Sequence, residues 1–125
     1  MSNNIIITLS GIGTINAELL RHYAPLSTDA IINKLPIILR GRFSFGSKIY
    51  WTLPGVEIYK GHNPKSVNCV EKGDIIYNPK TDELIILLEN AEMPNKVNKV
   101  GKVSSNLEIL LKARNGLNTK ISMVN

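Results

Sequence analysis

The pattern of hydrophobic and polar positions is that of a protein built mainly from short β-strands. Residues 74–77 and 84–88 are two apolar runs, and a polar segment with Asn78, Pro79 and Asp82 separates them. β-branched and aromatic runs on either side of a Pro/Asn/Asp cluster are typical of two antiparallel strands joined by a turn. The second run has no polar alternation, which predicts that both of its faces are covered. We therefore expect this hairpin near the middle of a sheet.

Two strands and a short helix are predicted ahead of this hairpin. Residues 4–9 are rich in isoleucine and residues 15–20 alternate apolar with polar side chains, so a strand hairpin is expected there. Pro25 ends the second strand, and Ser27 or Thr28 is suited to the N-cap of the helix that follows. The next proline ends this helix.

The segment between the helix and the central hairpin returns to a strand pattern. Residues 37–45 and 48–53 predict two strands, with Gly46 and Ser47 in the turn between them. A further short strand is expected at residues 56–59. Together these segments supply neighbours for the central hairpin.

After the hairpin the pattern predicts a loop, a brief strand, a helix and a final strand. Residues 90–98 contain a proline and are predicted as a loop, and the valines of residues 97–103 indicate a brief strand. Ser105 and Glu108 have the spacing of a capping box, and the leucines that follow form one helical stripe. Residues 117–124 predict a last strand that pairs near the first one.

Many short strands with only two helices favour one mainly β domain over residues 1–125. We expect its sheet to close into a barrel whose open ends the two helices cover. The chain has no internal repeat, linker or low-complexity tract.

The composition is that of an ordinary folded protein, with 43% hydrophobic and 20% charged residues. The net charge of +5 is concentrated in residues 91–125, which carry six Lys/Arg against two acidic residues, whereas residues 1–90 carry nine against eight. The lysines are scattered singly, without a basic run or interleaved aromatic residues, so we do not expect nucleic-acid binding.

The chain has neither a basic leader nor a long apolar segment at its N-terminus, so we expect no signal peptide and no membrane span. Cys69 is the one cysteine, which favours a reducing compartment and a buried, unreactive thiol. We therefore expect a cytoplasmic protein.

Several stretches resemble the cyclophilin-like superfamily. Residues 15–20 and 24–30 resemble the opening of cyclophilins, in which a strand ends at an Ala-Pro before a capped helix. Residues 45–51, 70–79 and 100–103 resemble a small stand-alone bacterial and archaeal family with an atypical cyclophilin-like fold and largely unassigned biochemistry. The resemblance implies a closed β-barrel of about eight strands with two short capping helices.

The resemblance also raises prolyl isomerase chemistry. Cyclophilins use an arginine that hydrogen-bonds the prolyl amide, together with Phe-His-Arg and Gln-Gly-Gly motifs and an apolar proline pocket. This chain contains no glutamine and no Phe-His-Arg. Arg40 and Arg42 lie in roughly the region of the family's arginine, but we assign no catalytic residue. A divergent peptidyl-prolyl cis-trans isomerase is kept as the alternative function.

Other chemistry has little support in the residue pattern. His22 and His62 have no Cys or carboxylate at ligand spacing, so we expect no metal site, and we expect no cofactor. Asp82 and Glu83 are interpreted as a solvated pair in a turn, and Asp74 as a residue that fixes the entrance of its strand.

An aromatic band gives the best functional hypothesis, because six of the seven aromatic residues fall between positions 43 and 77. Aromatic side chains with a polar tip suit ligand grooves, and an arginine at the edge could hold a carboxylate. Trp51 suits a core equally well. The predicted ligand-binding residues are Arg40, Arg42, Tyr50, Trp51 and Tyr77.

We therefore predict a non-catalytic module that binds a small molecule or a proline-containing peptide. A third interpretation is an accessory domain similar to the cyclophilin-like domains of urea-degrading enzymes, which would bind a protein partner. The pattern makes no prediction of oligomeric state.

Overall fold

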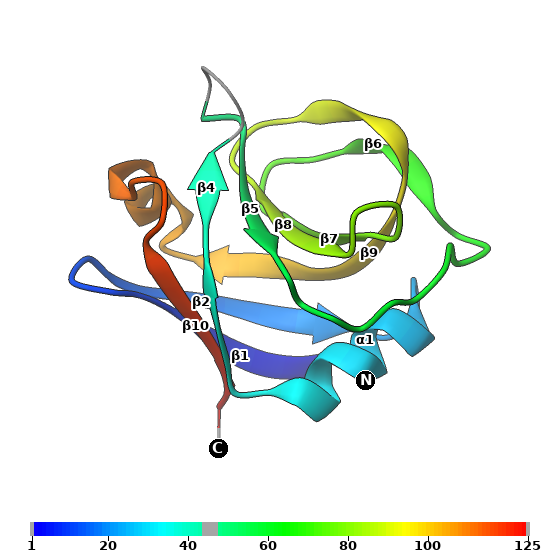
Figure 1. The fold of residues 1–125 in the computed structure, drawn as a ribbon, viewed down its shortest axis with the longest axis horizontal. Coiled ribbons are helices and arrows are strands. Elements are labelled where there is room, and N and C mark those ends of the chain that lie inside the picture. Colours follow the sequence, from blue (N-terminus) through cyan, green and yellow to red (C-terminus); the bar gives the residue numbers. More distant parts are fainter. Residues whose placement is uncertain (1, 44–47, 125) are drawn as a thin grey trace.

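The fold is mainly β, as the hydrophobic pattern predicts. The computed structural model describes residues 2–43 and 48–124 (Figure 1). The strands and helices of these residues are β1 (Ser2–Leu9), β2 (Gly13–Leu20), α1 (Pro25–Lys34), β3 (Ile37–Arg40), β4 (Arg42–Phe43), β5 (Tyr50–Pro54), β6 (Val67–Val70), β7 (Asp74–Asn78), β8 (Glu83–Leu87), β9 (Ala91–Ser105), the 3-10 helix η1 (Leu107–Lys112) and β10 (Asn118–Met123).

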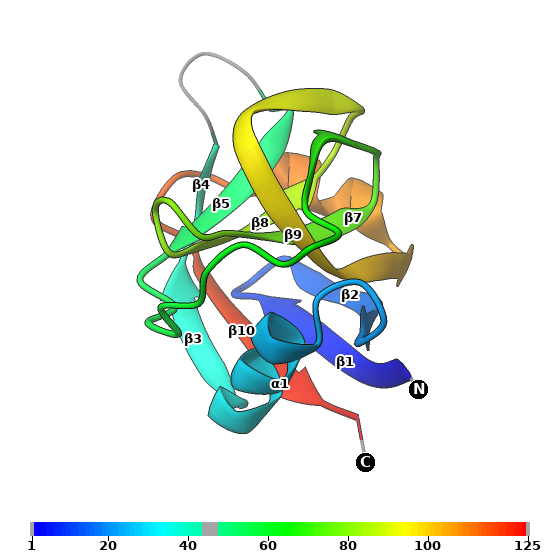
Figure 2. The same ribbon diagram turned by 90° about the vertical axis from the view of Figure 1, so that its right-hand side faces the viewer.

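One antiparallel sheet of ten strands contains every described strand. Its order is β3-β10-β1-β2-β9-β7-β8-β5-β4, and β6 pairs with β9 beside this path. The predicted hairpin at the N-terminus is confirmed as β1 and β2, and the prediction that the last strand pairs near the first is confirmed by β10, which pairs with β1. Figure 1 shows these three strands side by side, and Figure 2 shows α1 next to β1.

The central hairpin is confirmed as β7 and β8, which lie between β9 and β5 in the sheet. Ile75 pairs with Ile86 and Ile76 with Ile85. All five residues of β7 are buried, as are residues 84–87 of β8, so both faces of the hairpin are covered as predicted.

The two faces of this hairpin belong to two different apolar clusters. One face contributes to the main core, which β1, β2, β5, β10 and α1 complete with residues such as Ile7, Trp51 and Ile31. The opposite face contributes to a smaller cluster, completed by β6 and the first half of β9. Its buried members are Val70, Ile76, Ile85, Leu87, Met93 and Val97.

The expectation of a closed barrel is wrong for the part of the chain that the structure describes, because its sheet has two ends, β3 and β4. β3 pairs with β10 and β4 with β5, and only Gly41 separates the two end strands in sequence. Gly41 donates its N–H to the Leu117 carbonyl and accepts from the Gly116 N–H. The chain therefore passes from one end of the sheet to the other without a ladder that would seal it.

The predicted loop at residues 90–98 is wrong, because these residues belong almost entirely to the 15-residue strand β9. Val97 pairs with Val67 and Glu92 with Cys69, and the register shifts between these pairs. Pro94 lies within this irregular stretch, where a strand tolerates a residue without an N–H donor. Figure 1 shows β9 curving from its yellow start near β6 to its orange end beside β2.

Both predicted helix starts are wrong in detail. The first helix begins at Pro25 without a side-chain cap, because the Thr28 hydroxyl donates to the Leu20 carbonyl and Ser27 is buried. The predicted capping box fails because Ser105 is the last residue of β9 and its hydroxyl accepts a hydrogen bond from Asn16. A 3-10 helix follows in place of the expected α-helix.

Two smaller expectations are wrong, and a third falls on residues that the structure does not describe. Residues 56–59 do not form a strand, and Cys69 is exposed and not buried as expected. The predicted turn at Gly46 and Ser47 lies outside the described residues, as do the last two residues of the strand predicted at 37–45. Among the described helices, none is long and apolar enough to cross a membrane.

Candidate functional site

A cavity of about 720 Å³ lies on the face of the sheet that points away from the main core. Strands β4, β5 and β8 supply its floor, the turn between β7 and β8 supplies one side, and the first half of β9 supplies another. Ligand-binding pockets in proteins are commonly of this size. The cavity is therefore a candidate ligand site.

The strand register explains which side chains reach this cavity. Arg42 of β4 is opposite Thr52 of β5, and Thr52 is opposite Ile85 of β8, so these three residues form one row across the sheet. Directly opposed residues in an antiparallel sheet point to the same face, and successive residues point to opposite faces. The row of Arg42, Thr52 and Ile85 faces the cavity, while the intervening Trp51 faces the main core.

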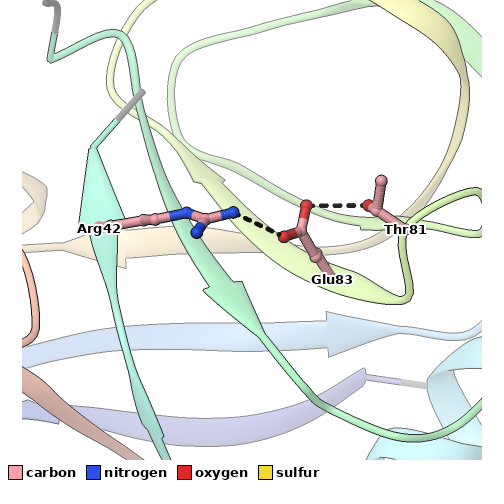
Figure 3. Close-up of polar contacts among 3 residues, drawn as sticks. All are labelled: Arg42, Thr81 and Glu83. Atoms are coloured by element: carbon pink, nitrogen blue, oxygen red, sulfur yellow. Dashed lines mark hydrogen bonds and ion pairs between the residues drawn. The ribbon is translucent and has the colours of Figure 1, made fainter. Parts of the chain in front are cut away.

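A pair of opposite charges lies at the polar side of the cavity (Figure 3). Nη2 of Arg42 is 3.2 Å from Oε2 of Glu83, and the Thr81 hydroxyl donates to Oε1 of Glu83 at 2.8 Å. The Glu83 side chain is 15% exposed and the Arg42 side chain is 59% exposed. The carboxylate is therefore held at two points near the floor, while much of the guanidinium faces solvent.

Two further polar groups are fixed by hydrogen bonds. Asn95 donates to Oδ1 of the buried Asn78 at 2.9 Å, which ties β9 to the end of β7. Oδ1 of Asn115 accepts from the Phe43 N–H at 2.9 Å, which places this amide beside β4. Both amides line the cavity and are pre-positioned for polar contacts with a ligand.

The remaining lining is apolar. Ile85 and Met93 are buried members of the smaller cluster, and Tyr50 packs against that cluster while it also lines the cavity. Pro94 lines the cavity from β9. The site therefore combines one charged and polar side with one apolar side, a combination typical of sites for small organic ligands.

Asp82 holds the loop before β6 in place, close to this site but outside its lining. Its carboxylate accepts from the backbone N–H groups of Glu57 at 2.8 Å and Tyr59 at 2.8 Å, and from the Tyr77 hydroxyl at 2.5 Å. Asp82 lies in a turn as predicted, but its carboxylate is engaged in these hydrogen bonds and is not simply solvated. Asp74 accepts from the Glu71 N–H and fixes its strand entrance as predicted.

These contacts shift two pKa values in opposite directions. Burial, followed by the hydrogen bond to Asp82, raises the pKa of the Tyr77 phenol far above its ordinary value. Partial burial alone would raise the pKa of the Asp82 carboxyl, but the hydrogen bonds from Tyr77 and from the backbone of Tyr59, Glu57 and Ile58 outweigh it and hold this pKa below its usual range.

The structure brings two of the five predicted ligand-binding residues together. Arg42 and Tyr50 both line the cavity. Arg40 is exposed on β3 opposite Asn118 and lies outside the cavity lining. The other two are core residues with no exposed surface for a ligand.

Trp51 and Tyr77 are each 0% exposed, and both belong to the main core. The Trp51 indole N–H donates to the Thr119 hydroxyl at 3.2 Å, and the Phe43 ring packs edge-on against the indole at 4.7 Å. Trp51 therefore stabilises the core, the alternative that its residue type allowed from the outset.

The sequence reasoning missed Glu83, Asn95 and Met93 as residues of this site. Glu83 was interpreted as solvated, although its place two residues before Ile85 puts both on one face of the same strand. Asn95 and Met93 were missed because their segment was predicted as a loop. The one available signal was the two-residue spacing of Glu83 and Ile85 on one predicted strand.

The described residues contain no group of three or more His, Cys, Asp or Glu side chains that could hold a metal ion.

No family model matches the chain, and no curated protein matches it. Several solved structures share its fold, among them the hypothetical protein AF2241 and McbB. The hypothetical protein AF2241 from Archaeoglobus fulgidus superposes with a TM-score of 0.78 at 18% identity, covering 98% of this chain and 95% of AF2241. McbB, solved in complex with tryptophan, superposes with a TM-score of 0.78 at 13% identity, covering 94% of this chain and 44% of McbB. At these identities the similarity shows the fold alone.

Proposed function

We propose that this chain is a small-ligand-binding module and that the cavity beside Arg42 and Glu83 is its binding site. The observation that carries the proposal is the ion pair of these two residues at the edge of a 720 Å³ cavity whose other side is apolar. A charged pair orients a ligand, and apolar surface supplies binding free energy.

Two further points support the proposal. McbB, of which this chain covers 44%, was solved in complex with tryptophan, so one larger protein that contains this fold binds a small organic molecule. The sequence resemblance to the stand-alone cyclophilin-like family adds a superfamily in which peptides bind. We propose a relationship to that superfamily on the quoted motifs, and a cytoplasmic location, which the single free thiol of Cys69 suits.

Nuclear magnetic resonance of the isotope-labelled protein tests the proposal. A panel of anionic, cationic, zwitterionic and neutral metabolites is added at millimolar concentration, and chemical shifts are followed residue by residue. We expect at least one class to shift the signals of Tyr50, Ile85 and Met93 while the signals of β1 and β10 stay in place. A panel that leaves the cavity signals unmoved would contradict the proposed function.

Arg42→Gln and Arg40→Gln form a matched pair for the same experiment. The two arginines flank Gly41, but only Arg42 lines the cavity. We expect Arg42→Gln to weaken the shifts that a charged ligand causes and Arg40→Gln to leave them unchanged. Equal effects of the two substitutions would show that general surface charge, and not the cavity, binds the ligand.

A divergent prolyl isomerase is the second candidate, favoured by the position of Arg42 beside the apolar surface of Ile85 and Met93. A guanidinium next to an apolar pocket is the pairing that a prolyl amide and its ring require. A protease-coupled assay on an Ala-Pro peptide separates the two functions. Acceleration that Arg42→Gln abolishes and Arg40→Gln preserves would favour the isomerase.

A further inference from the structure

We propose that the ligand of this cavity is a free α-amino acid with an apolar side chain, an inference that rests on the proposed function. The class follows from three features of the lining, which are the available hydrogen-bonding positions of one ion pair, the opposite charges of its two partners and the position of the apolar surface.

Among the residues that the structure describes, the ion pair at the cavity edge uses few of its hydrogen-bonding positions. A guanidinium has five N–H donors and an ionised carboxylate has about four acceptor positions. Arg42 and Glu83 are joined by a single contact at 3.2 Å, not by the bidentate arrangement that saturates both groups. Thr81 occupies one more position on Glu83. Both partners can therefore bind a ligand without separating fully.

An α-amino acid matches this pair because it carries the complementary charges on one carbon atom. Its carboxylate can accept from the free N–H groups of Arg42 while its ammonium donates to the free lone pairs of Glu83. This exchange brings no net charge into the cavity, so it avoids the cost of burying an unbalanced ion.

Ligands with a single charge fit the pair less well. An anion bound to Arg42 lies within a few ångströms of the Glu83 carboxylate, which repels it, although the exposed Lys80 at the rim attracts it. A cation bound to Glu83 meets the guanidinium of Arg42, and the exposed Lys80 at the rim of the cavity adds to the repulsion. The zwitterion alone turns both repulsions into attractions.

The apolar surface lies where the side chain of such a ligand would extend. Ile85 is two strands from Arg42 in the same row, a separation of about 10 Å at ordinary strand spacing. Met93 and Tyr50 border the same region. A phenylalanine, tryptophan or leucine side chain anchored at the ion pair can therefore reach this surface, whereas the side chain of alanine cannot.

Isothermal titration calorimetry with the phenylalanine series tests the proposal. L-Phenylalanine keeps both charges, 3-phenylpropionate lacks the ammonium, and phenethylamine lacks the carboxylate. We expect L-phenylalanine to bind roughly 10- to 100-fold more tightly than either analogue, the effect of one lost hydrogen bond to a charged group. L-Alanine should bind more weakly than L-phenylalanine because it leaves the apolar surface uncovered.

Two variants test which charged group of the ligand each residue of the ion pair binds. Glu83→Gln should remove the preference for L-phenylalanine over 3-phenylpropionate, and Arg42→Gln should remove its preference over phenethylamine. Arg40→Gln should keep both preferences. Thermal unfolding of each variant shows that the fold is retained.

The possible outcomes distinguish a wrong ligand class from a wrong binding site. If 3-phenylpropionate binds as tightly as L-phenylalanine, the zwitterion is wrong and the binding module stands. If no member of the series binds, the amino-acid proposal is overturned, while the binding module falls only when the full metabolite panel leaves the cavity signals unmoved.

Discussion

The two faces of strands β5 and β8 differ sharply although they are made by alternate residues of the same short segments. On one face Trp51 and Leu53 are each 0% exposed and pack into the main core. On the other face Tyr50 and Thr52 line the cavity. A shift of a single residue therefore separates packing from a candidate binding surface, because side chains alternate along a strand.

The two faces also differ in how far their polar groups are satisfied by hydrogen bonds within the protein. On the main-core face, β5 and β7 bury two polar aromatic atoms, the Trp51 indole nitrogen and the Tyr77 hydroxyl, and both have hydrogen-bond partners. The cavity face carries the Arg42–Glu83 ion pair, which uses few of its hydrogen-bonding positions within the described part of the chain. The first face is saturated, whereas the second can exchange partners.

The largest effect that this comparison predicts is on the core face. Trp51→Ala removes a fully buried indole and should lower the free energy of unfolding by about 3–5 kcal/mol. Tyr50→Ala, one residue away on the cavity face, should lower it by less than about 2 kcal/mol because that side chain is half-buried. Urea denaturation of both variants measures the difference, and equal losses would contradict the distinction between the faces.

A substitution at Asp82 tests how much the hydrogen bonds accepted by its carboxylate stabilise the fold. Asp82 has a positive φ of 56°, which asparagine tolerates well, so Asp82→Asn removes the charge with little backbone strain. We expect it to lower the free energy of unfolding by about 1–3 kcal/mol, because the acceptor oxygen loses its charge and the oxygen that accepts from Glu57 becomes an N–H donor. Tyr77→Phe removes one of these bonds and should have an effect of the same sign and no larger size.

The comparison of the wild type with Asp82→Asn also gives a prediction about pH. Because the folded-state pKa of Asp82 is lowered, its contribution to stability is complete above the ordinary aspartate pKa, about 4, and is lost as the pH falls through the lowered value. The stability difference between the wild type and Asp82→Asn should therefore shrink below about pH 4. Denaturation curves at pH 7 and pH 3 measure it, and a constant difference would show that Asp82 is not the titrating group.

The smallest effect on stability is expected on the cavity face. Arg42→Gln breaks an ion pair whose arginine is largely exposed, so the free energy of unfolding should change by less than about 1 kcal/mol. A larger loss would mean that this ion pair stabilises the fold and is not available to a ligand. Urea denaturation alongside Arg40→Gln provides the matched control.

Local patterns predicted the parts of the fold that depend on neighbouring residues. The hairpin of β7 and β8 was predicted because its turn residues and its apolar runs adjoin in sequence. The brief strand predicted at residues 97–103 lies within β9, but the first half of β9 was missed because Pro94 suggested a loop, and its place in the sheet depends on β2, β6 and β7. These partners are distant in sequence, so the local pattern carries little information about them.

The candidate site was predicted in part for the same reason. Arg42 and Tyr50 were identified from their residue types, but the choice between Tyr50 and Trp51 required knowledge of which face is the core. Arg40 and Arg42 were indistinguishable in sequence, since both were expected on one face of a single strand. The interruption at Gly41 separates them, and a Cβ at this position would overlap the Trp51 indole.

The length of β9 has a consequence for how the chain reaches its native state. This strand pairs with β2, far upstream, and with β6 and β7, so the hairpin of β1 and β2 must wait for residues 101–105 before one of its edges is satisfied. During synthesis that edge emerges from the ribosome long before its partner. Because these strand pairs join residues that are far apart in sequence, we expect folding to be slow. Until β9 has been synthesised, the unpaired edge of the amino-terminal hairpin is open to association with other chains.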